Sequence, residues 1–234
     1  MERGNLKLSV YHQIDLPLIN LGFELRTTGK ERKEIREIIL KEFESLGVGI
    51  PTSKKRWHLV STVVFKEHPI TEHILRFWNV ADEQERDEFC ICASLSVFPI
   101  LNQVLDTVVQ LNGIRDSVSQ KEIRNRISKI HGARSSVKQT VQKCLQSLNK
   151  WDVIHSPKSG FYVPRNPIIC TSIVGSAAIA SQLQHSLSDG IRIENVASKS
   201  PLSLWDFSSF TPHESHCIQL RIGAQGREFV VVES

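Results

Sequence analysis

The chain has 234 residues, 40% of them hydrophobic, with 12 Gly, 9 Pro and a formal net charge of +4. This composition provides enough apolar material for a core and too little Gly and Pro for low complexity, which excludes collagen-like and wholly disordered proteins. No apolar run approaches the roughly 18 residues that a membrane span needs. The charged residues near Met1 are not followed by an apolar stretch of signal-peptide length.

Five cysteines are scattered along the chain, without the even number and regular spacing of a disulfide framework. We expect reduced thiols, which are typical of the cytoplasm, and therefore predict a cytoplasmic protein. The cysteines are Cys90, Cys92, Cys144, Cys170 and Cys217.

Four regions are expected in a mainly α (α+β) fold. Residues 1–28 show no sustained period and are predicted to be an N-terminal arm that packs against the body. Residues 29–115 are predicted to form a helical bundle and residues 116–166 a winged helix–turn–helix. Residues 167–234 are predicted to form a smaller α/β or β-hairpin region that ends in a hairpin.

Apolar residues at helical spacing predict four or five helices in the bundle. The first helix ends at Gly47. A second follows Ser53, although that short apolar stretch could also be a strand, and a third covers residues 71–80. Asp82 is the N-cap candidate of a fourth, and Pro99 suits the first turn of a fifth. The inward positions of the first helix are Ile35, Ile38, Ile39, Phe43 and Leu46.

Residues 119–165, here called the basic segment, carry ten Lys and Arg residues and two acidic ones. The segment has a net charge of +8, so the rest of the chain sums to −4. A compact basic region in an otherwise slightly acidic protein is typical of a phosphate-binding surface.

A helix–turn–helix is predicted inside the basic segment. Ser119 and Glu122 form a capping-box pattern at the start of the first helix. A short turn that contains Gly132 follows, and Ser135 or Ser136 is expected to cap the second helix. The inward positions of the first helix are Ile123, Ile127 and Ile130.

The second helix has two contrasting faces. One repeats apolar residues as a buried stripe: Val137, Val141, Leu145 and Leu148. The other is basic and rich in amides, with no acidic residue, and amides read base edges in a major groove. This second face comprises Lys138, Gln139, Gln142, Lys143, Gln146 and Lys150.

A hairpin with a basic tip follows directly. Trp151, Val153 and His155 alternate as in a strand, residues 157–160 turn, and residues 161–163 return. A hairpin directly behind a helix–turn–helix is the organisation of a winged helix. We therefore predict contact with duplex DNA, with the start of the second helix near phosphates. The predicted DNA-binding residues are Arg134, Ser135, Ser136, Lys138, Gln139, Gln142, Lys143, Gln146 and Lys158.

Two other interpretations of the basic segment stay open: a merely solvated helix face, and a winged helix that binds protein. Duplex DNA is favoured over RNA because the sequence offers no aromatic stacking platform of the single-strand-binding type.

In the C-terminal region a helix is predicted over residues 168–180 and a strand over residues 190–193. The terminal hairpin is predicted to pair residues 217–222 with 229–232 around a turn at 223–226.

No catalytic, metal or cofactor site is predicted, and the protein is expected not to be an enzyme. The run from His213 to Cys217 contains metal-ligating residue types but no fourth well-placed ligand. Cys90 and Cys92 have neither redox nor zinc spacing. The four Trp residues are expected in the core. The acidic–acidic–Lys order of nucleases has only a loose counterpart in Asp189, Glu194 and Lys199.

The layout resembles the BrxA family, small accessory proteins of bacteriophage-exclusion (BREX) defence islands in which a NusB-like helical bundle is joined to a winged helix. The resemblance covers residues 30–165, whereas the last 70 residues are longer and more β-like than expected of that family. It implies a cytoplasmic, non-catalytic, DNA-binding component of a phage-defence system that acts beside larger enzymes. The motifs that carry it are Phe98-Pro99-Ile100-Leu101, Ser135–Thr140, the stripe at Leu145 and Leu148, and the strand Trp151–Ile154.

Three functions are compatible with this organisation. The first is a DNA-binding accessory protein of a multi-protein phage-defence or DNA-processing system, with double-stranded DNA and other proteins of that system as partners. The second is a transcriptional regulator with a sensing or dimerising C-terminal region. The third is a winged-helix assembly subunit whose basic face contacts an acidic protein.

Overall fold

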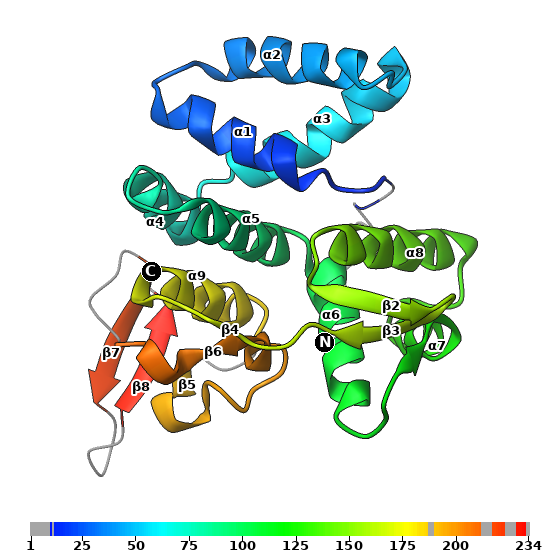
Figure 1. Ribbon diagram of the computed structural model, residues 1–234, viewed down its shortest axis with the longest axis vertical. Coiled ribbons are helices and arrows are strands. Elements are labelled where there is room, and N and C mark those ends of the chain that lie inside the picture. The colour runs from blue at the N-terminus through cyan, green and yellow to red at the C-terminus, as the bar shows by residue number, and fades with distance from the viewer. Residues whose placement is uncertain (1–9, 11, 187–189, 212–216, 223–227, 233–234) are drawn as a thin grey trace.

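The computed structural model describes residues 10, 12–186, 190–211, 217–222 and 228–232. Within these residues the fold is mainly helical, with nine α-helices and three small sheets, which confirms the predicted class. Figure 1 shows α1–α3 as an upper layer, α4 and α5 beneath it, and two units side by side below: the one that contains α6–α8, and the C-terminal region. None of the described helices is long and apolar enough to cross a membrane; α5 and α6 pass that test only as a pair bent by 109°.

The upper layer contains a helix that the sequence did not predict. Residues 16–27, expected to belong to an arm, form α1 (Leu16–Thr27), which packs on α2 (Arg32–Ser45), α3 (Ile50–Val64) and α5 (Glu83–Val97). A helix covered on several sides lacks a one-sided apolar stripe, so its periodicity is weak. A Cβ at Gly22 would lie 2.8 Å from Val64 Cγ2, so α1 and α3 approach closely.

The other bundle helices follow the predicted pattern. The segment after Ser53 is helical (α3), and α4 (Pro69–Phe77) and α6 (Pro99–Asn112) both begin at proline. Asp82 caps α5, because its carboxylate accepts a hydrogen bond from the Glu85 N–H at 2.9 Å. One detail of α2 was wrong: Leu46 is 68% exposed, because the helix ends at Ser45 before Leu46 can pack.

Residues 118–164, here called the helix–hairpin unit, contain β1 (Val118–Ser119), α7 (Gln120–His131), α8 (Ser135–Lys150), β2 (Ile154–Lys158) and β3 (Phe161–Pro164). The three strands form an antiparallel sheet in the order β1-β3-β2. The bundle helix α6 packs on α7, α8 and β3. The last helix of the predicted bundle therefore also supports the helix–hairpin unit.

The C-terminal region is built around one buried helix. Ile168–Ile169 form the short strand β4, parallel to β6 (Trp205–Asp206), so the helix predicted over 168–180 begins later, as α9 (Ser172–Leu183). The predicted strand and terminal hairpin form the antiparallel sheet β5-β8-β7 (Gly190–Arg192, Glu228–Val232, Ile218–Ile222). The predicted turn at 223–226 lies outside the described residues. Three 3-10 turns complete the region at Ile193–Asn195, Leu202–Leu204 and Phe207–Ser209.

A buried ion pair joins the bundle to Arg165, the residue that directly follows the helix–hairpin unit, and a hydrogen bond extends this contact to the C-terminal region. Glu88 on α5 accepts two hydrogen bonds from the Arg165 guanidinium, at 2.6 and 2.7 Å. The same carboxylate accepts the indole N–H of Trp205 at 2.8 Å. Three donors satisfy a carboxylate that burial alone would make costly. This contact therefore fixes how the three parts meet.

Candidate nucleic-acid interface

The start of α7 confirms the predicted capping box. Ser119 Oγ accepts the Glu122 N–H at 3.2 Å, and the Glu122 carboxylate accepts the Ser119 N–H at 3.1 Å. Arg115 also pairs with Glu122. The hairpin tip is hydrogen-bonded to the start of α7, because the Gln120 N–H donates to the Gly160 carbonyl at 2.8 Å. One of the two acidic residues of the basic segment is thus committed to helix capping and an ion pair.

The inner face of α7 was predicted only in part. Ile123 and Ile127 are fully buried, but Ile130, expected inward, is 62% exposed in the last turn. Periodicity sets the direction of a side chain, whereas the neighbours decide whether that direction is covered. His131 closes the helix by donating from Nε2 to Gln103 on α6 at 2.6 Å, and partial burial lowers its pKa.

The start of α8 differs from the prediction that Ser135 or Ser136 caps it. Both serines lie inside the helix, the N-cap position is Arg134, and no side-chain hydrogen bond caps the helix. The turn before it places Gly132 at φ 85°, which only glycine adopts readily. An uncapped helix start leaves backbone N–H groups and the positive end of the helix dipole for an anion.

The two faces of α8 are as the sequence predicted. The stripe Val137, Val141, Leu145 and Leu148 is fully buried. On the opposite side Lys143 is half-buried and donates from Nζ to Gln146 Oε1 at 3.0 Å. The other side chains of that face are exposed: Lys138, Gln139, Gln142, Gln146 and Lys150.

The hairpin tip places a further cation at the interface. Lys158 is exposed, and its ammonium lies over the Phe161 ring, 5.3 Å from the ring centre, in a cation–π contact. Ser156 Oγ donates to the Lys158 carbonyl at 3.1 Å, and Gly160 has φ 77°. In Figure 1 the hairpin runs alongside α8. The structure thus brings the predicted residues of the tip and of α8 into one unit.

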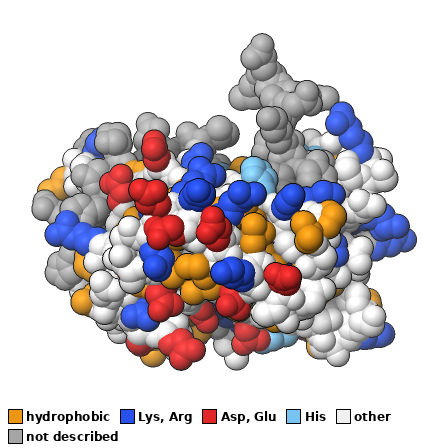
Figure 2. Space-filling view, turned by 90° about the horizontal axis from the view of Figure 1, so that it is seen from above, with side chains coloured by type: hydrophobic (Ala, Val, Ile, Leu, Met, Phe, Trp, Pro, Cys, Tyr) orange, Lys and Arg blue, Asp and Glu red, His pale blue; other side chains and the backbone are white. Residues whose placement is uncertain are grey.

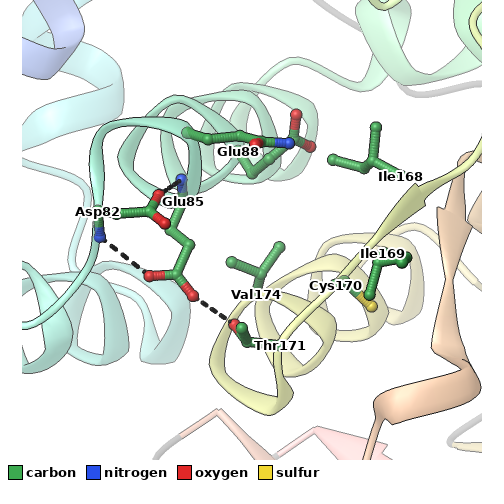
Figure 3. Close-up of a pocket in the computed structure, with 9 residues that line it drawn as sticks. Asp82, Glu85, Glu88, Ile168, Ile169, Cys170, Thr171 and Val174 are labelled. Carbon is green, nitrogen blue, oxygen red and sulfur yellow. Dashed lines mark hydrogen bonds between the residues drawn. The ribbon is translucent and has the colours of Figure 1, made fainter.

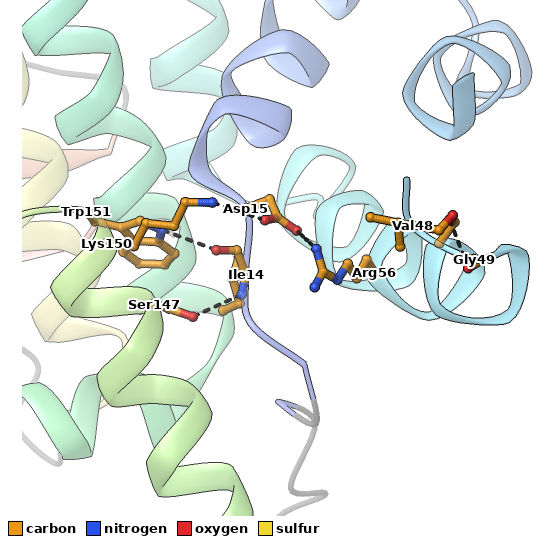
Figure 4. Close-up of polar contacts among 9 residues, drawn as sticks. Ile14, Asp15, Val48, Gly49, Arg56, Ser147, Lys150 and Trp151 are labelled. Carbon is orange, nitrogen blue, oxygen red and sulfur yellow. Dashed lines mark hydrogen bonds and ion pairs between the residues drawn. The ribbon is translucent and has the colours of Figure 1, made fainter. Parts of the chain in front are cut away.

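The C-terminal half of α8 is partly covered (Figure 4). The Ile14 N–H donates to Ser147 Oγ at 2.9 Å, and the indole N–H of Trp151 donates to the Ile14 carbonyl at 3.3 Å. Lys150 forms an ion pair with Asp15 at 3.6 Å. Lys150 and the buried Arg165 are therefore committed to internal ion pairs, so the basic segment presents less free charge than its composition suggests.

Figure 2 shows the surface seen from above α2. Lys, Arg, Asp and Glu mix over the middle of this face, whereas its right-hand edge carries Lys and Arg without Asp or Glu. The helix–hairpin unit lies on the right in Figure 1, and the two views share their horizontal axis. On this face, the side on which the helix–hairpin unit lies is therefore the more uniformly positive one.

A cavity with an acidic lining lies at the start of α5 (Figure 3). It has a volume of about 100 Å³ and is lined by Asp82, Glu85, Glu88 and Thr171, whose hydroxyl donates to Glu85 Oε1 at 2.7 Å. Its carboxylates are already bound by the helix cap, by Thr171 and by Arg165. This volume is below the roughly 300 Å³ of ordinary small-molecule pockets. The acidic lining also disfavours phosphate.

The remaining candidate groups lie in the core or outside the described residues. All four Trp residues are buried, as predicted: Trp57, Trp78, Trp151 and Trp205. Burial raises the pKa of the Cys170 thiol to about 12 and that of Cys90, Cys92 and Cys144 further, which makes thiolate chemistry unfavourable there. Among described residues no three His, Cys, Asp or Glu side chains are placed to hold a metal ion. Residues 213–216 and Asp189 lie outside the described part.

Comparison with protein-family models, with curated protein sequences and with solved structures finds no match for this chain.

Proposed function

We propose that this protein binds duplex DNA through a winged helix made of α6, β1, α7, α8, β2 and β3, as a non-catalytic accessory protein of a multi-protein phage-defence or DNA-processing system. The observation that carries the proposal is the exposed face of α8, which has Lys and amide side chains, no acidic residue, and an uncapped start. The order of elements and the β1-β3-β2 sheet support the winged-helix assignment.

The dimensions of α8 suit a major groove. An α-helix with side chains is about 10–12 Å wide, and the groove of B-DNA is about 12 Å wide. Gln139 and Gln142 are the exposed amides nearest the helix start, where they could pair with adenine edges. Arg134 and Lys138 would contact phosphates beside them. Lys158 would contact the backbone from the hairpin tip.

The cover over the second half of α8 limits how much of the helix enters the groove. Because Ser147, Lys150 and Trp151 contact residues 14–15, only the first turns project freely. We therefore expect phosphate contacts to dominate the affinity and sequence preference to be modest. Weak intrinsic specificity fits an accessory role beside larger enzymes in the cytoplasm, as the BrxA-like layout implies.

The test is fluorescence anisotropy with a random duplex of about 30 base pairs across roughly 50 to 300 mM salt. Wild-type binding should weaken steeply with salt. The triple variant Lys138→Ala, Gln142→Ala, Lys143→Ala should lose at least about tenfold in affinity, because it removes two lysines that would contact phosphates. Each lost contact should also reduce the slope of log affinity against log salt by about one. Its melting temperature should stay near that of wild type, since these side chains lie off the buried stripe.

A matched control replaces exposed lysines of α2, as Lys33→Ala and Lys41→Ala, and should bind like wild type. No binding of wild type at the lowest salt would overturn the proposal and favour an assembly subunit with an acidic protein partner. Sequence-selective binding by a dimer would instead favour a transcriptional regulator.

A further inference from the structure

The strip of surface between α3 and α8 is here called the seam (Figure 4). Residues 14 and 15 run through it, and Asp15 forms ion pairs with Arg56 of α3 at 3.3 Å and with Lys150 of α8 at 3.6 Å. The two helices therefore flank the same short stretch of chain. Asp15 thus bridges one cation of α3 and one cation of α8.

The seam has more positive than negative charge. Its Asp15 carboxylate is 11% exposed and already has two cationic partners. Lys55, one residue before Arg56, is exposed and has no ion pair among the described residues, and Lys143 is half-buried. Two cations of this seam are thus left without a carboxylate.

His12 belongs to the same stretch of chain, two residues before Ile14, whose N–H is bound by Ser147 of α8. It is half-buried, and its pKa is lowered first by burial and then by the positive charges of Lys55, Arg56 and Lys143. Cations on two different helices thus act on one imidazole.

We propose that the seam formed by His12, Lys55 and Lys143 is a second phosphate-binding region, so that a duplex held by α8 also rests its backbone on α3. This inference rests on the proposed function. Lys143 precedes Lys150 by seven residues, about two helical turns, so both side chains lie on the same side of α8. Lys150 already pairs with Asp15 at the seam. Lys143 therefore lies on the seam side of α8.

The inference predicts that binding takes up a proton. A phosphate at the seam favours imidazolium, so the pKa of His12 is higher in the complex than in the free protein. Affinity should then rise as the pH falls from about 7.5 to 5.5. The charged groups that face His12 are Lys55 and Arg56 of α3 and Lys143 of α8, and Asp15 and Lys150 lie along the same seam.

The experiment compares full-length wild type with Lys55→Glu, Lys55→Gln and His12→Gln by anisotropy on the same duplex. Lys55→Glu should weaken binding about fivefold or more, and Lys55→Gln should reduce the salt slope by about one. His12→Gln should flatten the pH dependence. Lys33→Glu on α2 is the matched control and should leave affinity, salt slope and pH dependence unchanged.

The outcomes separate this inference from the function on which it rests. If wild type binds and the triple α8 variant does not, but Lys55→Glu behaves like Lys33→Glu, the seam is not a phosphate-binding region and the winged-helix proposal stands. If wild type does not bind at all, both fail. Circular dichroism melting of each variant checks folding. If Lys55→Glu lowers the melting temperature, Lys55→Gln replaces it as the variant that tests the seam.

Discussion

The helices α2 and α8 are two versions of one amphipathic design. They have 14 and 16 residues, and each buries a stripe of fully enclosed apolar side chains. Their exposed faces differ. Over its length α2 carries four basic and four acidic residues, whereas α8 carries three Lys and three Gln and no acidic residue.

Their starts differ in the same sense. A capping box closes α2, because the Glu31 side chain accepts the N–H of Glu34 and the Glu34 carboxylate accepts the Glu31 N–H at 2.9 Å. Arg134 stands at the corresponding position of α8 and caps nothing. A mixed-sign face with a closed start suits solvent, while a single-sign face with an open start suits a polyanion. In each helix the buried face determines how the helix packs in the core, and the exposed face with the helix start determines which partner it suits.

The largest expected effect tests what the two helices share. Leu145→Ala in α8 and Phe43→Ala in α2 each empty a fully buried position. Each should lower the free energy of unfolding by about 3 kcal/mol, from lost burial and the remaining cavity. Urea unfolding followed by circular dichroism measures both. A loss confined to one variant would show that the two stripes do not contribute equally.

A second variant sharpens the difference between the two starts. Arg134→Asp introduces a capping carboxylate at the N-cap of α8, whose φ of −87° and ψ of 150° suit a cap. It should raise the free energy of unfolding by about 1 kcal/mol. It should also weaken DNA binding about tenfold, because a cation is replaced by an anion beside the phosphates. Gains in both stability and affinity would contradict the assignment of this helix start to phosphate.

The smallest expected effect tests whether positive charge on any exposed helix is enough for DNA binding. Glu37→Gln with Glu44→Gln gives α2 an excess of two positive charges, and both side chains are exposed. Placed in the triple α8 variant, the pair should restore affinity by less than about twofold, because α2 lacks the neighbouring hairpin tip. Anisotropy at low salt measures this. Full recovery of affinity would show that net positive charge alone attracts DNA, without an interface on α8.

Much of the fold could be predicted because its signals are local. The helices of the bundle, the N-cap at Asp82, the capping box at Ser119 and the stripe of α8 each depend on residues within about four positions of one another. The exposed residues of the candidate interface were predicted for the same reason. Once the stripe of α8 points inward, Lys138 and Gln142 must point outward.

The errors share one cause, which is that neighbours distant in sequence decide what a local pattern means. Helix α1 was missed because it packs against four other helices, α2 to α5, and so lacks a one-sided apolar stripe. Ile130 is exposed although its spacing is that of an inward residue, and Ser135 lies inside a helix that it was expected to cap.

The sequence by itself determined the helices, their apolar stripes and the location of the basic segment, because these depend on spacing within about four residues. The tertiary structure alone decided which of those charges are free. Arg165 is paired with Glu88, 77 positions away, and Lys150 with Asp15 from the other end of the chain. It also brought Arg56 of α3, which is outside the basic segment, and Lys150 of α8 to the same carboxylate, that of Asp15. Ion pairing depends on distance in space, and that distance exists only after the helices have packed.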